Sequence, residues 1–361
     1  MSDVKKFVVP WLHEAGYYSI QSVDDVEANP EWARMSINEC PMPPSDKLVN
    51  AVAAAAKKGN RYPGTPNKLR TKVANLYGLD KDNVWFGNGS SELIDATMRI
   101  FVRPGDEVII HQPAFSMYGV RISVCGGVPV DVPMKENYDF DIDSVLAAVT
   151  EKTKVIMITS PNNPSGNFIS DEDMTRVFET GLPIFFDEAY LEFAPERESK
   201  AQLIKKYPNV MVYHTLSKAY GIAGLRFGYV LADPEVINYF KSVVITWNNS
   251  WLNMAAAEAA IDDTEELAKK VNFNNKWVKY FCDELGAIKG VKPYMSHGNY
   301  VLVDATDTGK TADQIHADAL ANNFQLKKFK PHHTRDGVFR ITIGTEEQNQ
   351  NLATWLKSYF G

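Results

Sequence analysis

Short apolar runs alternate with longer amphipathic segments through the middle of the chain. Five runs rich in Val, Ile and Phe predict buried strands: 106–115 (DEVIIHQPAF), 153–166 (TKVIMITSPNNPSG), 182–190 (LPIFFDEAY), 209–218 (NVMVYHTLSK) and 227–232 (FGYVLA). Turn residues follow each run, and the segments between them, such as 171–180 and 195–207, have helical character. Strands that alternate with helices predict an α/β fold with a mainly parallel sheet.

The last hundred residues follow a different pattern. Residues 264–287 (TEELAKKVNFNNKWVKYFCDELGA) predict one long helix, and two strand candidates, 299–305 (NYVLVDA) and 338–344 (VFRITIG), precede a final helix. We therefore expect three parts. They are an N-terminal segment over 1–45 that packs with the small domain, a large three-layer α/β/α domain over 46–255, and a small α+β domain over 256–361.

Composition and charge narrow the classes of function. The 361 residues carry a net charge of −7, which argues against a general nucleic-acid binder. No stretch approaches the roughly 20 apolar residues of a membrane span, and the N-terminus does not resemble a signal peptide. Cys40, Cys125 and Cys282 are widely separated, so they predict neither a disulfide framework nor a zinc site. We expect a cytoplasmic protein without a metal ion.

Polar side chains gather where the predicted strands end. Ligands of open parallel sheets bind outside the carboxyl ends of the strands, so these positions are candidates for a functional site. Three consecutive strand ends supply an amide, a carboxylate and an amine. The candidates are Ser160, Asn163, Asp187, Tyr190, Thr215, Ser217 and Lys218.

These residue types match the groups of one cofactor. A partly desolvated Lys218 has a lowered pKa and could attack a carbonyl carbon, and Asp187 could pair with a protonated ring nitrogen. Asn163 and Tyr190 could bond a phenolate oxygen, while Arg226 and nearby hydroxyls could hold a phosphate. An aldehyde, a pyridinium, a phenolate and a phosphate on one molecule describe pyridoxal 5′-phosphate (PLP).

A possible anion site also lies upstream, at residues 87–91 (GNGSS). The free backbone N–H groups of Ser90 and Ser91, at the start of an amphipathic helix, would point at an anion. Taken alone, this motif is more commonly a capped helix after a turn.

Several ordered motifs, from RYPG at 61–64 to FRITIGTEEQN at 339–349, carry a resemblance that covers nearly the whole chain. The sequence resembles the fold-type I PLP-dependent aminotransferases of class I/II, and within them the histidinol-phosphate aminotransferase group. The resemblance implies an aspartate aminotransferase-like fold, a homodimer with shared active sites and a role in amino acid biosynthesis.

The resemblance also implies roles for residues that hold the cofactor ring. Lys218 matches the Schiff-base lysine that shuttles the substrate proton, and Asp187 matches the carboxylate that keeps the pyridine nitrogen protonated. Tyr190 and Asn163 match the groups that bond the phenolic oxygen. Tyr118, in PAFSMY, matches the aromatic residue that stacks on the ring, although a tyrosine there could also be core filler.

Further roles concern the phosphate and the substrate. The residues that match the phosphate cup are Ser90, Ser91, Thr215, Ser217 and Arg226. Tyr62, in RYPG, resembles a tyrosine that reaches the cofactor phosphate of a neighbouring subunit. Arg340, in FRITIG, matches the arginine that binds the anionic group of the substrate, although it could be a surface charge. Tyr18 and Asn38 are candidates to line the substrate mouth.

The implied activity is transfer of an amino group from an amino acid or a histidinol-phosphate-like amino-alcohol phosphate to a 2-oxo acid such as 2-oxoglutarate. The group has a second substrate-binding arginine upstream of the Arg340 position, where this chain has Lys327 or Lys328. Lysine keeps the positive charge but cannot form the paired hydrogen bonds that an arginine guanidinium makes to a phosphate.

Trp247 and Trp251 could line an aromatic entrance to the substrate site or pack in the core. The alternatives are an aromatic amino acid aminotransferase, a PLP-dependent decarboxylase such as a threonine-phosphate decarboxylase, and a non-catalytic PLP-binding protein.

Overall fold

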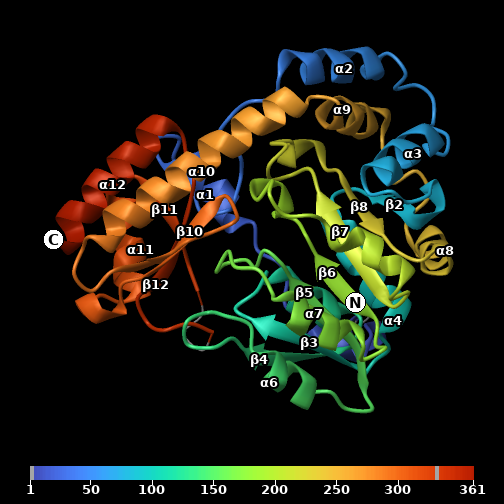
Figure 1. Ribbon diagram of the computed structural model, residues 1–361, viewed down its shortest axis with the longest axis horizontal. Coiled ribbons are helices and arrows are strands. Elements are labelled where there is room, and N and C mark those ends of the chain that lie inside the picture. Colours follow the sequence, from blue (N-terminus) through green and yellow to red (C-terminus); the bar gives the residue numbers. More distant parts are fainter. Residues whose placement is uncertain (1–3, 330–332) are drawn as a thin grey trace.

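The structure is a computed structural model that describes residues 4–329 and 333–361. Within these residues the strands form two sheets, whose arrangement Figure 1 shows. The larger sheet has the strand order β2-β8-β7-β6-β5-β3-β4, and the smaller has the order β1-β11-β12-β10-β9. The first three residues of the predicted N-terminal segment, and residues 330–332 of the predicted small domain, lie outside the described residues.

The seven-stranded sheet is mainly parallel. Its strands are β2 (Val84–Gly87), β3 (Glu107–Gln112), β4 (Val128–Pro133), β5 (Thr153–Thr159), β6 (Ile184–Asp187), β7 (Val210–Thr215) and β8 (Gly228–Leu231). Strands β4, β3, β5, β6 and β7 are parallel neighbours, whereas β8 runs antiparallel to β7 and β2. Strands β6 and β7 are buried along their whole length, as expected for parallel strands covered on both faces.

Helices cover both faces of this sheet. They are α2 (Asp46–Ala56), α3 (Asn67–Leu76), α4 (Ser90–Phe101), α5 (Met117–Val124), α6 (Ile142–Ala147), α7 (Asp171–Phe178), α8 (Pro234–Val243) and α9 (Trp251–Ile261). Phe185 and Phe186 are neighbours in β6 and point to opposite faces. Phe186 packs in a core that includes α3 and α7, and Phe185 packs in a core that includes α4, α5 and α8. The three-layer α/β/α prediction is confirmed.

The five-stranded sheet combines the two ends of the chain. Its strands are β1 (Ala33–Met35), β9 (Lys292–Tyr294), β10 (Tyr300–Asp304), β11 (Phe324–Lys328) and β12 (Val338–Thr342). The nearby helices are α1 (Gln21–Ala28), α10 (Thr264–Gly286), α11 (Ala312–Ala321) and α12 (Glu346–Phe360). Strand β1 pairs in parallel with β11, so the N-terminal segment joins this sheet. A separate core contains Met35 of β1, Phe281 of α10 and Leu352 of α12.

One predicted helix differs from the structure. The segment 195–207 contains only a short 3-10 helix, at whose start the Glu188 carboxylate accepts a hydrogen bond from the Lys200 amide (2.8 Å) and another from the Ser199 hydroxyl (2.5 Å). The short 3-10 helices are η1 (Val4–Phe7), η2 (Pro10–His13), η3 (Lys81–Asn83), η4 (Leu191–Phe193), η5 (Lys200–Lys205), η6 (Ala223–Leu225) and η7 (Thr306–Thr308). Among the described residues, no helix combines the length and the apolar character needed to cross a membrane.

Candidate active site

The carboxyl ends of β5, β6 and β7 converge at one edge of the large sheet. Thr159 at the end of β5 lies beside Asp187 at the end of β6, and Asp187 lies beside Tyr213 near the end of β7. The loops that follow these strands carry Asn163, Tyr190 and Lys218. The parallel register therefore brings together the side chains that the sequence places at consecutive strand ends.

Asp187 is a buried carboxylate with strong hydrogen-bond donors. Its Oδ2 accepts a hydrogen bond from the Tyr118 hydroxyl (2.6 Å), and its Oδ1 accepts one from the Ala189 amide (3.0 Å). Burial raises the pKa of Asp187, and these two hydrogen bonds oppose the rise. The carboxylate is thus suited to pair with a protonated nitrogen of a ligand.

Tyr118 lies behind Asp187 and is fully buried. Its hydroxyl is also 2.9 Å from the Thr159 hydroxyl, and its ring packs edge-on against Phe185 with the centroids 5.5 Å apart. The half-buried Phe115, which the sequence did not single out, packs edge-on between Tyr118 and Tyr18. The stacking role expected of Tyr118 stays a prediction, and Phe115 is a second candidate for it.

Lys218 is half-buried, and its amine points back to the N-terminal segment. Its Nζ donates a hydrogen bond to the Asn38 carbonyl oxygen (3.1 Å) and lies 5.9 Å from the centroid of the Tyr190 ring. Burial, together with the positive charge of Arg340, lowers the pKa of Lys218 to about 8. A neutral amine is therefore accessible near physiological pH, as a nucleophile or a proton acceptor requires.

Tyr190 and Asn38 form a buried pair beside this amine. The Asn38 side-chain amide donates to the Tyr190 hydroxyl over 2.8 Å. Burial raises the pKa of Tyr190 to about 12, so its hydroxyl keeps its proton and remains a donor. Asn38 thus contacts both Lys218 and Tyr190.

Arg340 brings a cation from the small sheet to the same place. Its Nη1 donates to the Asn163 side-chain oxygen and its Nη2 to the Ser36 carbonyl oxygen, each over 2.5 Å. The guanidinium lies over the Tyr300 ring, 5.3 Å from its centroid. Its buried Nε has no hydrogen-bond acceptor among the described residues, so this side chain can still bind an anionic ligand.

A second cation lies next to Arg340. Lys327 in β11 is directly opposite Arg340 in β12, and residues opposite each other in antiparallel strands point to the same face. Lys327 is solvent-exposed as a residue, while partial desolvation of its amine and the charge of Arg340 lower its pKa. Lys328 instead forms an ion pair with Asp313. Of the two lysines considered from the sequence, Lys327 is the one beside Arg340.

The predicted phosphate cup is a cluster of donors around the start of α4. Arg226 points its Nη2 at the Ser91 hydroxyl (3.4 Å) and its Nη1 at the Ser217 hydroxyl (3.5 Å). The Thr215 hydroxyl is 3.0 Å from that of Ser217. Gly89 has a φ of +76°, and a Cβ there would overlap Arg226 Nη2. Hydroxyls, a guanidinium and a helix N-terminus are the donors that a phosphate needs.

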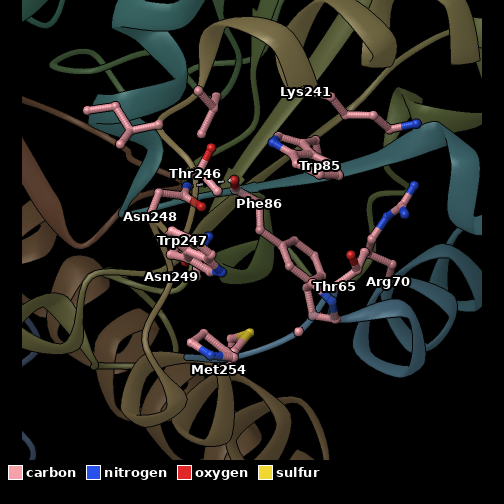
Figure 2. A pocket seen from close by; sticks show the side chains of 15 residues that line it. Thr65, Arg70, Trp85, Phe86, Lys241, Thr246, Trp247, Asn248, Asn249 and Met254 are labelled. Atoms are coloured by element: carbon pink, nitrogen blue, oxygen red, sulfur yellow. Dashed lines mark hydrogen bonds between the residues drawn. The ribbon is translucent and has the colours of Figure 1, made fainter. Parts of the chain in front are cut away.

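Tyr62 lies apart from this cluster, on the surface. It is 74% exposed and stacks on Trp247, with the ring centroids 4.3 Å apart. A pocket of about 370 Å³ lies beside this aromatic pair, and Figure 2 shows Trp85, Phe86 and Trp247 among the side chains around it. None of the predicted cofactor residues lines this pocket.

The structure brings Tyr18, Asn38, Asn163, Asp187, Tyr190, Lys218 and Arg340 to one site. Sequence reasoning missed Ser36, Phe115 and Thr342, which contact members of this group. Thr342 could have been found, because it lies two residues after Arg340 in an alternating strand and therefore shares its face. No group of three His, Cys, Asp or Glu side chains in the described part of the chain is arranged to hold a metal ion.

Comparison with known proteins identifies relatives over nearly the whole chain. Residues 30–356 match the family described as aminotransferase class I and II. The histidinol-phosphate aminotransferase of Ruegeria pomeroyi is 34% identical over 340 residues, 93% of this chain and 91% of that protein. That of Thermoanaerobacter sp. is 32% identical over 92% of this chain and 94% of that protein.

Solved structures share the fold. Histidinol-phosphate aminotransferase from Sinorhizobium meliloti in complex with pyridoxal-5′-phosphate is similar with a TM-score of 0.87, at 24% identity, over 97% of this chain and 96% of that one. L-threonine-O-3-phosphate decarboxylase from Porphyromonas gingivalis is similar with a TM-score of 0.77, at 19% identity, over 90% of this chain and 98% of that one.

Proposed function

Because the chain belongs to the class I and II aminotransferase family and is a PLP-dependent transaminase, we propose that it transfers the amino group of a histidinol-phosphate-like donor to a 2-oxo acid such as 2-oxoglutarate. The observation that carries this proposal is the convergence of Lys218 and Asp187 from the large sheet with Arg340 from the small one. An amine, a carboxylate and an anion-binding arginine lie around one site.

The donor set fits PLP. Asp187 would face the ring nitrogen, Tyr190 and Asn163 the phenolic oxygen, and Lys218 the aldehyde. The residues proposed for the phosphate are Ser90, Ser91, Thr215, Ser217 and Arg226. The absence of a Cβ at Gly89, where one would overlap Arg226 Nη2, lets the guanidinium lie against the start of α4 and supports this assignment. When bound, PLP supplies a ring that accepts electrons and so makes the α-proton of an amino donor removable.

Lys218 moves the proton. With its pKa lowered to about 8, Nζ can exist as a free base that accepts the α-proton of the donor. Tyr190 keeps its own proton near pH 8, because burial raises its pKa to about 12, and its hydroxyl would donate a hydrogen bond to the phenolic oxygen of PLP. Tyr118 and Ala189 donate hydrogen bonds to Asp187 and oppose the rise in its pKa that burial causes, which favours a carboxylate that would hold a proton on the nitrogen it faces. Tyr118 is proposed for the ring face, and Phe115, which packs edge-on against it, is a second candidate.

Two cations support a donor that carries a phosphate. Arg340 has a buried Nε without a hydrogen-bond acceptor among the described residues, and Lys327 lies opposite it. Burial raises the pKa of the Tyr18 hydroxyl, and the nearby charge of Arg340 opposes this rise. Together they offer charge and hydrogen bonds to a doubly charged group. The names of the curated relatives at 32–36% identity support the same substrate class.

We also propose that the enzyme is a cytoplasmic homodimer with shared active sites. The exposed Tyr62–Trp247 pair and the pocket beside it support a second copy at this surface. The free thiols of Cys40, Cys125 and Cys282 are consistent with a reducing compartment.

A panel of amino donors tests the proposed substrate. PLP-loaded enzyme is mixed in turn with histidinol phosphate, phosphoserine, phenylalanine and tyrosine, and loss of the bound PLP spectrum and formation of the carbonyl product are followed. Histidinol phosphate should react fastest. Faster reaction of tyrosine or phenylalanine would favour an aromatic aminotransferase, and release of carbon dioxide without a carbonyl product would refute transamination.

A further inference from the structure

One face of β12 holds the N-terminal segment 36–38 in place. Arg340 and Thr342 are two residues apart, so their side chains point to the same face. Arg340 Nη2 donates to the Ser36 carbonyl oxygen. The Thr342 hydroxyl donates a hydrogen bond to the Asn38 side-chain oxygen (2.9 Å) and accepts one from the Asn38 backbone N–H (3.1 Å). Strand β12 of the small sheet thus binds segment 36–38, which contacts Lys218.

Asn38 has a backbone conformation that needs such support. Its φ of +58° is in the left-handed region, which L-residues other than glycine rarely adopt, although asparagine tolerates it best. In this conformation its carbonyl oxygen accepts from Lys218 Nζ and its side-chain amide donates to the Tyr190 hydroxyl. One residue therefore orients two groups that come from the ends of β6 and β7.

We propose that Thr342 is a positioning residue that acts through Asn38 to aim Lys218 and Tyr190. A single hydroxyl serves both the backbone N–H and the side-chain oxygen of Asn38, and among the described residues no other group makes these two hydrogen bonds. Thr342 is 1% exposed, and water cannot replace the hydroxyl when it is removed. Asn38 is 2% exposed, so without the hydroxyl its backbone N–H and side-chain oxygen would be buried without a hydrogen-bond partner. Such a state is unfavourable, so Asn38 would adopt a different conformation.

The consequence concerns the Lys218 amine. A carbonyl oxygen aimed at Nζ stabilises the ammonium form more than the neutral amine, so its loss lowers the pKa of Lys218 further. The other charged groups that act on this amine are Arg340 and Arg226, which lower its pKa, and Glu39 and Asp187, which raise it. None of these is removed by a change at Thr342. The inference rests on the proposed role of Lys218 in holding PLP.

The test compares Thr342→Val, which removes the hydroxyl at nearly constant shape, with Thr342→Ser, which keeps it. The first readout is the rate at which cofactor-free protein captures PLP covalently at each pH, trapped with borohydride and measured by mass. The second is the split between kcat and KM. For Thr342→Val we expect capture and kcat about tenfold slower with KM within about threefold, and a capture midpoint at lower pH. Thr342→Ser should stay within about threefold of wild type.

Two results would overturn the proposal: Thr342→Val that behaves as wild type in both readouts, or Thr342→Ser impaired as much as Thr342→Val. If Thr342→Val does not fold, Asn38→Gly replaces it. Glycine accepts the left-handed conformation without strain but lacks the side-chain contacts to Thr342 and Tyr190. It should also slow capture, and wild-type capture by Asn38→Gly would refute the role of Asn38. Failure of the wild type itself to capture PLP would instead refute the proposed function.

Discussion

At the residue scale, the charge state of Lys218 depends on cations that other segments supply. Arg340 from β12 and Arg226 from the turn between η6 and β8 both lower its pKa, in addition to the effect of burial. Only the neutral amine attacks an aldehyde, so PLP capture should speed up as pH rises through about 8 and level off above it.

Arg340→Gln should move this pH dependence. Removing a positive charge beside Lys218 makes its ammonium form more favourable, so the pKa rises and the capture midpoint should move up by about half to one pH unit. The measurement is the pH profile of covalent PLP capture by the cofactor-free protein. Arg335→Gln is the matched control, because Arg335 pairs with Asp304 and Asp307 instead. An unchanged midpoint in Arg340→Gln would contradict the electrostatic coupling.

Lys327 and Lys328 offer a second matched pair. Lys327 lies beside Arg340, whereas Lys328 pairs with the exposed Asp313 on the opposite face of β11. Lys327→Ala should raise the KM for a phosphate-bearing donor about tenfold, because one charged contact to the phosphate is lost. Lys328→Ala should leave this KM within about twofold, since an exposed ion pair contributes little. If the two variants change the KM by the same factor in steady-state kinetics, Lys327 does not bind the phosphate of the donor.

At the element scale, the turn before α4 determines whether a phosphate can approach the helix N-terminus. Gly89 is followed by Ser90, the first residue of the helix, and Arg226 packs directly against Gly89. On the other side, a Cβ on Gly228 would lie 2.5 Å from the Ser90 amide nitrogen. Two glycines thus allow β8 and the start of α4 to come close enough to share one anion.

Gly89→Ala should weaken PLP binding, because the methyl group would displace Arg226 from the cup. We expect an increase of at least about tenfold in the PLP dissociation constant, measured by titration of cofactor-free protein. Gly181→Ala is the control: Gly181 also has a positive φ of +72°, but a methyl group there would meet no atom of the described residues within 4 Å. Both variants should lose some thermal stability from backbone strain. Similar PLP affinity in the two variants would show that strain alone is responsible.

Elements with a strong local pattern were predicted correctly. All five apolar runs contain strands, and the long helix predicted at 264–287 is α10 (Thr264–Gly286). The segment 195–207 forms only the short 3-10 helix η5, and the carboxylate of Glu188 binds the backbone at its start. Local patterns do not report such a contact.

At the scale of the whole molecule, the site lies between two sheets with separate cores. The large sheet supplies the proposed cofactor residues, and the small sheet supplies Arg340, Lys327 and Thr342. The Tyr62–Trp247 pair lies near the edge of the large sheet formed by β2, whose Trp85 and Phe86 also line the neighbouring pocket.

Trp247→Glu should separate the proposed dimer into monomers, because it places a charge on the exposed aromatic surface. Light scattering coupled to gel filtration measures the mass directly. Val128→Glu is the control, since Val128 is 46% exposed but belongs to β4, at the opposite edge of the sheet. A wild-type protein that runs as a monomer, or a Trp247→Glu variant that remains a dimer, would contradict the proposed interface.

The sequence alone determined the sheet that carries the site and the type of chemistry at its strand ends. Burial between helices demands continuous apolar runs, and the residues after those runs must share one edge, so Asp187 and Lys218 could be identified locally. Only the tertiary structure decided which distant side chains face them. Asn38, Arg340 and Thr342 lie more than a hundred residues from Lys218 along the chain, and packing between the two sheets brings them to it. For the same reason Lys327, rather than Lys328, lies beside Arg340, because strand register selects the face to which each side chain points.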